Sequence, residues 1–373
     1  MRSLLLPVAD LTPSDGAAWR RLADRAAEPN PFFEADYVLP AVRHLSSGPI
    51  SLAVVADGDE WIACLPVERR RRWRWYPGRW VVTWRHVYCF LGTPLVDTSR
   101  VEPALEHLME AVSASGRGTW TALEWLDGGG HLRDALDGAL AARRSRALGL
   151  EAFERAALRR RAEASYLQET LKPARRKELR RLGRRLEEEL GEPVVLEDRA
   201  GDPDACEEFM RLEASGWKGR GGTALAADPA HAAFFREVCA AFAARGRLQL
   251  LRLGTPDRAV AMQCNLIAGG TLFCFKVAYD ETLARWSPGV QLEARAVDVF
   301  HGRTDVALAD SCADPDNELI NRMWPDRRAI TTLVVPPRGP LRHLSLRAVG
   351  ATSAARAQVH AVRASVVQSR AAR

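Results

Sequence analysis

The order of predicted elements repeats once along this 373-residue chain, and the repeat constrains the fold more than any other feature. Hydrophobic periodicity predicts helices, then three consecutive strands, then a helix, a strand and a helix in each half. Chains that alternate strands and helices in this way form sheets covered by helices. We therefore predict an α/β (α+β) fold of two similar domains, each a mixed central sheet flanked by helices, although the halves share no convincing residue identity.

The first half accounts for one copy of this pattern. Strands are predicted over residues 4–9, 51–57, 61–69, 80–91 and 119–126, and helices over residues 16–27, 34–45, 101–113 and 132–142. The turn Asp57-Gly58-Asp59 between two apolar runs is a hairpin signal. The sequence becomes strongly charged over residues 159–170, so we place one domain over residues 1–160 and a second over residues 165–340. A basic, alanine-rich tail follows over residues 341–373.

The second half opens with a basic amphipathic helix. Residues 172–185 contain eight basic side chains and one acid, and Leu179, Leu182 and Leu186 recur at helical spacing. Further helices are predicted over residues 204–217, 229–244, 289–300 and 317–323, and strands over residues 193–197, 248–253, 259–267, 271–279, 305–309 and 330–335. Asp228 is suited to cap the helix that starts at Pro229. A glycine-rich loop is predicted over residues 218–223.

The most informative segment is the strand that ends in Lys276-Val277-Ala278-Tyr279-Asp280, because the turn Ser287-Pro288-Gly289 and a helix follow it. The first N–H groups of such a helix have no internal partner and carry partial positive charge, so an anion such as a pyrophosphate fits there. Gly289 would allow close approach, and Arg285 could add a charged contact. The alternative is an ordinary strand-to-helix turn with Pro288 near the first helical position.

Four segments of residues 165–335 together resemble a known family. They are L-K-P-A-R-R-K-E-L-R-R-L from Leu171, E-x-x-G-W-K-G-R-G-G-T-A-L from Glu213, F-K-V-A-Y-D with S-P-G from Phe275, and D-S-C-A-D-P-D-N with M-W-P-D-R-R from Asp310. In these segments the chain resembles the CelD-like (cellulose-biosynthesis type) branch of the GNAT acetyltransferases, which are related more distantly to the Fem peptidyltransferases. The first half resembles the family more weakly, through Pro31-Phe32-Phe33 and Leu91-Gly92-Thr93-Pro94-Leu95.

The resemblance implies two tandem GNAT-like domains and an acyl-CoA co-substrate such as acetyl-CoA. Two adjacent parallel strands would splay apart, the pantetheine would lie in the gap, and the pyrophosphate would bind the loop before the central helix. Here that loop contains Arg285, Ser287, Gly289 and Val290. It departs from the common GNAT fingerprint (Q/R-x-x-G-x-G/A), because it supplies a single glycine in a different register. The first domain is expected to be degenerate, since Gly92-Thr93-Pro94 is not followed directly by a helix.

Acyl transfer to an amine needs a polarised carbonyl, a closely held amine and a base. Asp280 and Tyr279, at the end of the strand nearest the presumed thioester, are the candidate bases. Lys276 would bind an anionic group of the acceptor or polarise the carbonyl, and Trp217 with Lys218 would form a lid or acceptor wall. The alternative roles are structural: Asp280 as a turn cap, Tyr279 as a half-buried aromatic and Lys276 as a surface charge.

Other chemistries find less support in the sequence. The seven cysteines include no C-x-x-C pair and the eight histidines show no metal-ligand spacing, so neither a disulfide framework nor a metal is expected. Cys312 with His301 forms a possible nucleophile and base, but no local signature of a cysteine hydrolase is present. Packing is the alternative role for this thiol.

Residues 69–85 interleave seven arginines with four tryptophans, a pattern that suits RNA, phosphates or a membrane interface. Alternatively, Trp73, Trp75, Trp80 and Trp84 pack between the domains while the arginines are solvated. If this segment joined the basic helix of residues 172–185, a tRNA could lie across both. That arrangement would favour an aminoacyl-tRNA donor, as the Fem resemblance implies.

The formal net charge of +6 favours anionic partners in general. The N-terminal apolar run is too short for a signal peptide and no window is long enough to span a bilayer, so we expect a cytoplasmic protein without membrane insertion. Three functions remain open: an N-acyltransferase that uses acyl-CoA and a small-molecule amine, an aminoacyl-tRNA-dependent ligase, and a non-catalytic accessory protein of a polysaccharide or natural-product pathway. Exposed tryptophans would be consistent with a partner surface, including that of a homodimer.

Overall fold

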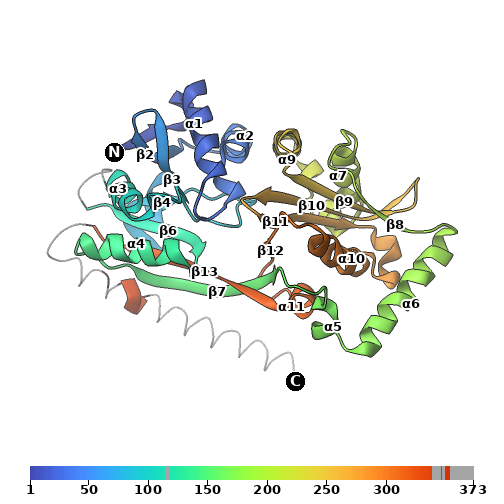
Figure 1. The fold of residues 1–373 in the computed structure, drawn as a ribbon. Helices are drawn as coiled ribbons and strands as arrows, with labels where there is room; N and C mark the ends of the chain where they lie inside the picture. The colour runs from blue at the N-terminus through green and yellow to red at the C-terminus, as the bar shows by residue number, and fades with distance from the viewer. Residues whose placement is uncertain (114–117, 338–345, 347–348, 353–373) are drawn as a thin grey trace, which may run out of the picture.

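The structure is a computed structural model that describes residues 1–113, 118–337, 346 and 349–352 (Figure 1). The first half contains β1 (Arg2–Pro7), η1 (Val8–Asp10), α1 (Pro13–Asp24), η2 (Pro31–Phe33), α2 (Ala35–Leu45), β2 (Ser51–Asp57), β3 (Glu60–Trp73), β4 (Tyr76–Thr83), β5 (Leu95–Val96), α3 (Val101–Ser113), β6 (Trp120–Asp127), α4 (His131–Ala142) and β7 (Leu148–Arg159). Nearly all of the predicted tail, residues 341–373, lies outside the described residues.

The second half repeats this order after two additional helices. It contains α5 (Tyr166–Thr170), α6 (Pro173–Leu190), β8 (Val195–Asp198), α7 (Ala205–Ser215), α8 (Trp217–Arg220), η3 (Leu225–Ala227), α9 (Pro229–Ala244), β9 (Leu248–Gly254), β10 (Ala259–Ala268), β11 (Thr271–Tyr279), η4 (Glu281–Trp286), α10 (Pro288–Gly302), β12 (Leu308–Asp310), α11 (Glu318–Met323) and β13 (Asp326–Val335).

All strands belong to one mixed sheet in the order β1-β2-β3-β4-β6-β13-β7-β12-β11-β10-β9-β8, with β5 beside β3. Two pairs are parallel, β4 with β6 and β11 with β12, and the others are antiparallel. Each half therefore contributes a meander that ends in one parallel pair. The predicted fold class, a mixed sheet flanked by helices in two similarly ordered halves, is confirmed.

The last strand of each half lies in the other half of the sheet. β13 pairs with β6, β7 pairs with β12, and the two exchanged strands pair with each other in the middle (Figure 1). Arg155 of β7 and Arg328 of β13 are direct partners in this central pair. The predicted division into residues 1–160 and 165–340 thus follows the repeat in the sequence, whereas in space each half holds the other's final strand.

Buried ion pairs hold the exchanged strands in place. Arg155 donates to Asp310 at 2.7 Å, and Arg328 donates to Asp310 at 2.8 Å and to Asp127 at 2.8 Å. Asp310 is fully buried, and burial alone would raise its pKa, but the two arginines and the hydrogen bond from the Cys312 backbone hold the pKa below its usual value. The D-S-C and P-D-R-R segments noted in the sequence form this junction.

Helices cover both faces of the sheet, and one core spans the two halves. In Figure 1, α7 and α9 lie above the strands of the second half and α10 lies below them. α9 packs against α2 of the first half, where Tyr37 meets Phe234 edge to face at 5.3 Å. Phe32 meets Phe273 of β11 in the same way at 5.7 Å. Because aromatic contacts continue from one half to the other, one large hydrophobic cluster spans both halves.

Local sequence signals account for the helices that frame the site. Asp228 caps α9, since its carboxylate accepts a hydrogen bond from the Ala230 N–H at 2.8 Å, and Pro229 occupies the first helical position as predicted. In α6, Leu179, Leu182 and Leu186 are the buried residues, as their spacing predicted. The rest of this helix is largely exposed and basic at its start.

The structure differs from the sequence predictions in one strand that was missed and in two elements whose bounds were wrong. β7 was missed, because its first part is half exposed and its alanines, glutamates and arginines carry no clear alternation. The strand predicted over residues 80–91 is wrong in its bounds: it is β4, which starts earlier and ends at Thr83, after which the chain turns. The loop predicted over residues 218–223 is wrong at its start, since Trp217–Arg220 form the short helix α8.

Candidate functional site

β11 runs parallel to β12 but continues past its end, which leaves one edge of β11 without a strand partner in the described part of the chain. β11 pairs with β12 only where Thr271, Leu272 and Phe273 face Leu308–Asp310. Beyond Phe273, no described strand pairs with this edge of β11. The backbone N–H and C=O groups on the rest of this edge therefore have no ladder partner among the described strands, although the Val277 carbonyl accepts a hydrogen bond from Lys218.

Lys276 projects from this open part of β11 into a cluster of charges. Its ammonium donates to Glu213 of α7 at 3.1 Å, and Lys218 of α8 donates to the same oxygen at 3.1 Å. Lys218 also donates to the Val277 carbonyl at 2.9 Å, while the second Glu213 oxygen accepts the Leu225 N–H at 2.8 Å. One carboxylate thus holds two lysines beside the strand edge.

Burial and charge set the protonation of this cluster. Burial alone would raise the pKa of Glu213, but Lys276, the hydrogen bond from the Leu225 backbone and Lys218 outweigh it and lower the pKa. Burial lowers the pKa of Lys276, and the nearby Glu213 offsets part of this effect. Two positive charges and one negative charge leave a net positive cluster, which favours an anionic group or a developing oxyanion.

The first half and α9 complete the cluster with two residues that the sequence analysis missed. The Lys276 ammonium lies 4.7 Å from the ring centroid of Tyr88, and the Tyr88 hydroxyl lies 3.0 Å from Nδ1 of His231. Burial, followed by the charges of Glu213 and Asp228, raises the pKa of Tyr88 to about 12. No local motif marks Tyr88, because only the packing of the first half against α9 brings it here.

Trp217 forms an exposed wall next to this cluster. Its side chain is 56% exposed, and its backbone N–H donates to Glu281 at 2.6 Å. The hollow between α8 and β11 has a volume of only about 20 Å³ and includes Lys218, Val277 and Tyr279 in its lining. Trp217 and Lys218 therefore lie together near Lys276, and their role as a lid or acceptor wall stays a prediction.

The second group of predicted residues meets at the start of α10. Pro288 occupies the first helical position, Ser287 before it has a left-handed backbone (φ 52°), and the first turn carries no acid. Gly289 lies against Tyr279, whose ring would be 3.4 Å from an added β carbon. Gly289 and Val290 are partly exposed, and the N–H groups of a first helical turn have no partner within the helix. This turn can receive an anion.

Arg285 and Asp280, also near this turn, already have partners. Arg285 pairs with Glu189 of α6 at 2.6 Å and stacks over Trp286. Asp280 accepts from the Thr282 N–H at 2.9 Å, caps η4 and pairs with Arg258. Although burial alone would raise the pKa of Asp280, its hydrogen bonds from Thr282 and Arg258 lower it. The turn-cap role considered for Asp280 is thus present in the structure.

Helix α6 passes beside the first turn of α10. The Gln291 side chain donates to the Leu179 carbonyl at 2.9 Å, and Gly183 faces the same side chain. The basic exposed face of α6 therefore lies close to the anion-accepting turn, which adds positive potential there.

The surroundings of Cys312 bear on its predicted alternative role as a nucleophile. Cys312 is buried, burial raises its pKa, and His301 contacts Tyr166 instead, which favours packing over a nucleophile.

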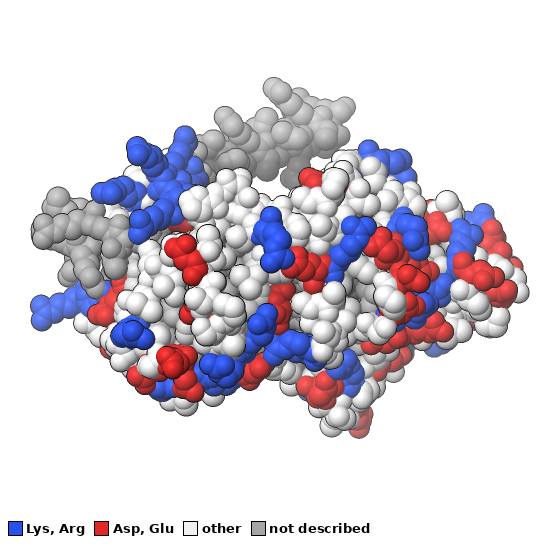
Figure 2. Space-filling view, turned by 90° about the horizontal axis from the view of Figure 1, so that it is seen from above, with Lys and Arg blue, Asp and Glu red and all other residues white. Residues whose placement is uncertain are grey.

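Trp73, Trp80 and Trp84 are buried, whereas residues 69–72 are exposed. Figure 2 shows Lys and Arg side chains gathered at one corner of the face seen from above, whereas blue and red side chains are mixed elsewhere. Trp73 and Trp80 pack against Val334 of the exchanged β13, so they do not fill a space between two separate domains.

Two searches of the described residues concern metals and membranes. No group of three or more His, Cys, Asp or Glu side chains in the described part of the chain is arranged to hold a metal ion. Among the helices of the described residues, none has the length and apolar character needed to cross a bilayer.

One family model matches part of the second half. Residues 173–310 match the model of a family described as an acetyltransferase (GNAT) domain. This range contains β8 to β12, Lys276 with Glu213 and Lys218, and the first turn of α10, whereas Tyr88 lies outside it. A search of the curated proteins found no relative of this chain.

Solved structures share the fold of nearly the whole chain at low identity. FemX matches with a TM-score of 0.57 at 10% identity, covering 90% of this chain and 97% of that one. A protein of unknown function from Bacteroides thetaiotaomicron matches at 0.54 and 12% identity, covering 88% and 98%. The C-terminal domain of a candidate lysylphosphatidylglycerol synthetase from Agrobacterium fabrum also matches at 0.54 and 12% identity, covering 89% and 95%. The acetyltransferase fold and its likeness to a Fem protein are thus supported, and the CelD-like branch stays a prediction.

Proposed function

We propose that this chain is an N-acyltransferase that moves an acyl group from acyl-CoA, for example acetyl-CoA, to an amine, with the reaction in the second half. The observation that carries the proposal is the edge of β11 that has no strand partner beyond β12 among the described residues, together with the acid-free first turn of α10, which follows after η4. A pantetheine arm needs a strand edge with free hydrogen-bonding groups, and a pyrophosphate needs unpaired N–H groups. β11 offers the strand edge and the start of α10 offers the N–H groups, with only η4 between them.

The residues near α10 fit the donor. Gly289 and Val290 would offer their N–H groups to the pyrophosphate, Ser287 would offer its hydroxyl, and Arg285 would turn from Glu189 toward the phosphates. In the transfer itself, the amine attacks the thioester carbonyl and the carbon–sulfur bond breaks. The proton lost by the amine leaves with a base, and the sulfur takes a proton to leave as the thiol of CoA.

The lysine cluster fits the acceptor side of the same gap. Lys276 would stabilise the negative charge that develops on the carbonyl oxygen, and Lys218 with Trp217 would hold the acceptor. Asp280 and Tyr279 remain candidates for the base, but Asp280 is engaged by Arg258. An imidazole suits proton transfer near neutral pH, and His231 lies beside Tyr88 at the edge of the cluster, so we add it as a candidate base.

The second candidate is an aminoacyl-tRNA-dependent ligase. Two observations favour it: the fold likeness to FemX over 90% of the chain, and the basic helix α6 beside the first turn of α10. In this function the gap would receive the aminoacyl end of a tRNA, and exposed arginines would contact its phosphates. The third possibility from the sequence, an accessory protein without catalysis, would leave the lysine cluster without a ligand.

Calorimetric titration with acetyl-CoA tests the proposal. We expect micromolar binding that Gly289→Glu weakens by about tenfold or more, because the added carboxylate repels the pyrophosphate at the helix start. The matched control is Gly302→Glu at the other end of α10, where an added side chain meets open space and binding should persist. Parallel titration with bulk tRNA separates the candidates. Salt-sensitive tRNA binding without acetyl-CoA binding would favour the ligase. Binding of neither acetyl-CoA nor tRNA would contradict both catalytic functions.

A further inference from the structure

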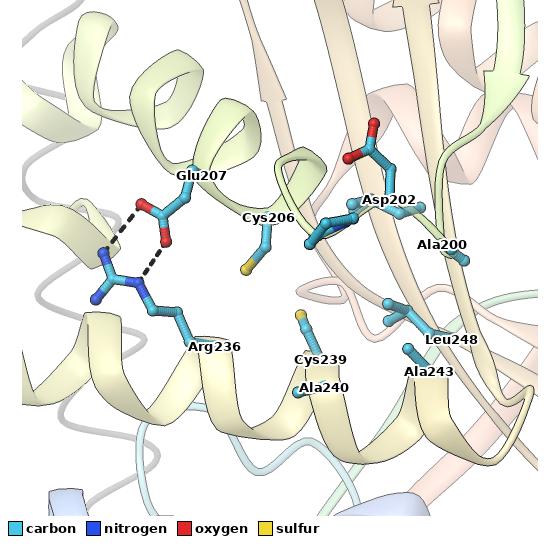
Figure 3. A pocket seen from close by; sticks show the side chains of 12 residues that line it. Ala200, Asp202, Cys206, Glu207, Arg236, Cys239, Ala240, Ala243 and Leu248 are labelled. Carbon is cyan, nitrogen blue, oxygen red and sulfur yellow. Dashed lines mark hydrogen bonds and ion pairs between the residues drawn. The ribbon is translucent and has the colours of Figure 1, made fainter.

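A pocket away from the lysine cluster lies between the start of α7 and the middle of α9 (Figure 3). It has a volume of about 510 Å³ and a largely apolar wall that includes Pro203, Ala240 and Leu250. Glu207 and Arg236 form an ion pair at one side. In Figure 3, the side chains of Cys206 and Cys239 point toward one another from the two helices. The pocket therefore brings two thiols together at a place that small molecules can reach.

The two thiols differ in exposure and in acidity. Cys206 is partly exposed and Cys239 is buried, and their side chains face each other (Figure 3). The nearby Cys239 thiol lowers the pKa of Cys206 despite burial and the charge of Glu207, whereas Cys206, Cys264 and burial raise the pKa of Cys239. Cys206 also occupies the second position of α7, an 11-residue helix whose N-terminus stabilises a thiolate. The exposed thiol of the pair is thus the one suited to react.

We propose that Cys206 and Cys239 form an oxidant-sensitive dithiol site, which a peroxide that enters the pocket converts into a disulfide between α7 and α9. The Cys206 thiolate attacks one oxygen of the peroxide, the O–O bond breaks, and the departing hydroxide takes a proton to become water. Cys206 is then a sulfenic acid. The Cys239 sulfur attacks the Cys206 sulfur, the S–O bond breaks, and a second water leaves with the proton from Cys239.

The remaining cysteines are poor competitors for the oxidant. Cys64, Cys89 and Cys312 are buried and Cys274 is partly exposed, and burial raises the pKa of each above its usual value, so little thiolate forms. Cys264 is the one exception by position, since its sulfur lies 3.9 Å from that of Cys239. It is fully buried behind Cys239, however, so oxidant that enters the pocket meets Cys206 first.

The disulfide would fasten together two helices that reach the lysine cluster. α7 carries Glu213, which binds Lys276 and Lys218, and α9 carries His231. Oxidation would therefore restrain the acceptor side of the gap and lower the rate of transfer. This consequence for activity rests on the proposed function, whereas formation of the disulfide does not.

Peptide mapping of the full chain after hydrogen peroxide treatment and alkylation tests the site. We expect a Cys206–Cys239 linked peptide as the main product at the lowest effective peroxide dose. The melting temperature should rise by about 3 °C, because the crosslink restricts the unfolded chain. Both effects should vanish in Cys206→Ser and in Cys239→Ser, reverse with dithiothreitol, and persist in Cys64→Ala as the matched control.

Three results would overturn the proposal: Cys206 oxidised without a linkage, a Cys239–Cys264 linkage as the main product, or thiols that stay reduced while added peroxide is present in excess. The outcome is separate from that of the proposed function, because peptide mapping needs no acyl donor. A linked peptide in a chain that binds no acetyl-CoA would support the dithiol site and contradict acyl transfer from CoA.

Discussion

Each half of the sheet contains one parallel strand pair. In the first half, side chains and backbone fill the space beside this pair, whereas in the second half one strand edge has no described strand as a partner. In the first half, β4 and β6 pair at Trp80–Val82, and the chain after β4 folds back into the space that follows. There the Arg85 guanidinium stacks 3.6 Å from the ring centroid of Trp125, and the Gly92 N–H donates to the Trp125 carbonyl at 2.7 Å. In the second half, the edge of β11 beyond Phe273 has no strand partner among the described residues, and Lys276 with its charged partners lies on this part of the strand.

The helices that follow the two meanders differ in the same sense. The segment before α3 contains the buried Asp97, the first turn carries Glu102, and Arg100 pairs with Asp57 and Glu60. The first turn of α10 carries no acid. Negative charge at a helix start repels an anion, so only the second half keeps a turn suited to phosphate. One copy of the repeat thus fills this space by packing, and the polar groups of the other copy are those that we propose bind a ligand.

The largest expected difference between the two halves concerns the buried ion pairs of the exchanged strands. Arg155 of β7 pairs with Asp310 at the end of β12, and Arg328 of β13 pairs with Asp127 at the end of β6. Asp310 is fully buried and receives both Arg155 and Arg328, whereas the Asp127 side chain is 22% exposed and receives only Arg328. We expect Asp310→Asn to lower the free energy of unfolding by about 3–5 kcal/mol, since two buried arginines lose their shared charge. Asp127→Asn should cost less than half as much.

Urea denaturation of both variants measures the difference. Arg322→Gln, which removes an exposed ion pair with Glu318, serves as the surface control and should change stability by less than about 1 kcal/mol. Equal losses of unfolding free energy in Asp310→Asn and Asp127→Asn would contradict the expectation that the ion pairs at Asp310 stabilise the fold more than the one at Asp127.

Alanine at two glycines tests how tightly each half is filled. A β carbon on Gly92 would lie 1.9 Å from the Glu124 carbonyl oxygen, so Gly92→Ala must shift backbone and should destabilise the fold by roughly 1–3 kcal/mol. A β carbon on Gly289 would meet the Tyr279 ring at 3.4 Å, an ordinary contact. Gly289→Ala should leave the melting temperature nearly unchanged. A stable Gly92→Ala would mean that the first half has room for a ligand as well.

The sequence predicted the succession of elements well because most of it is local. Capping by Asp228, the apolar spacing of Leu179, Leu182 and Leu186, and the hairpin turns all act over a few residues. The exchange of β7 and β13 could not be predicted from the sequence. β13 pairs with a strand about 200 residues earlier in the chain, and no local motif in either segment identifies its partner.

The candidate site was found in part for the same reason. Lys276, Tyr279 and Gly289 lie within one strand-turn-helix unit, so their proximity followed from sequence spacing. Glu213 appeared only as the first letter of a motif, and its role in holding two lysines emerged from the fold. Tyr88 belongs to the other half and reaches Lys276 only through packing of the shared core.

A buried glutamate in each half provides the finest comparison. Burial raises the pKa of Glu34 and of Glu293 from 4.5 to about 7, but Glu34 pairs with Arg247, whereas Glu293 accepts hydrogen bonds from Trp324 and Gln263. A raised pKa in the folded state means that folding takes up a proton between pH 4.5 and pH 7. The stability from such a group is present below about pH 4.5 and is lost as the pH rises through 7.

Neutral amides at these positions should therefore act in opposite directions. Glu293→Gln removes the cost of a buried, unpaired charge, so we expect the free energy of unfolding at pH 8 to rise by about 1 kcal/mol relative to the native chain, with a smaller gain at pH 5. Glu34→Gln leaves Arg247 without its anion and should destabilise the fold at pH 8. Denaturation at the two pH values measures both changes. A loss of stability in Glu293→Gln at pH 8 would mean that its carboxylate is ionised and satisfied in the fold, and that the two halves bury their glutamates in equivalent ways.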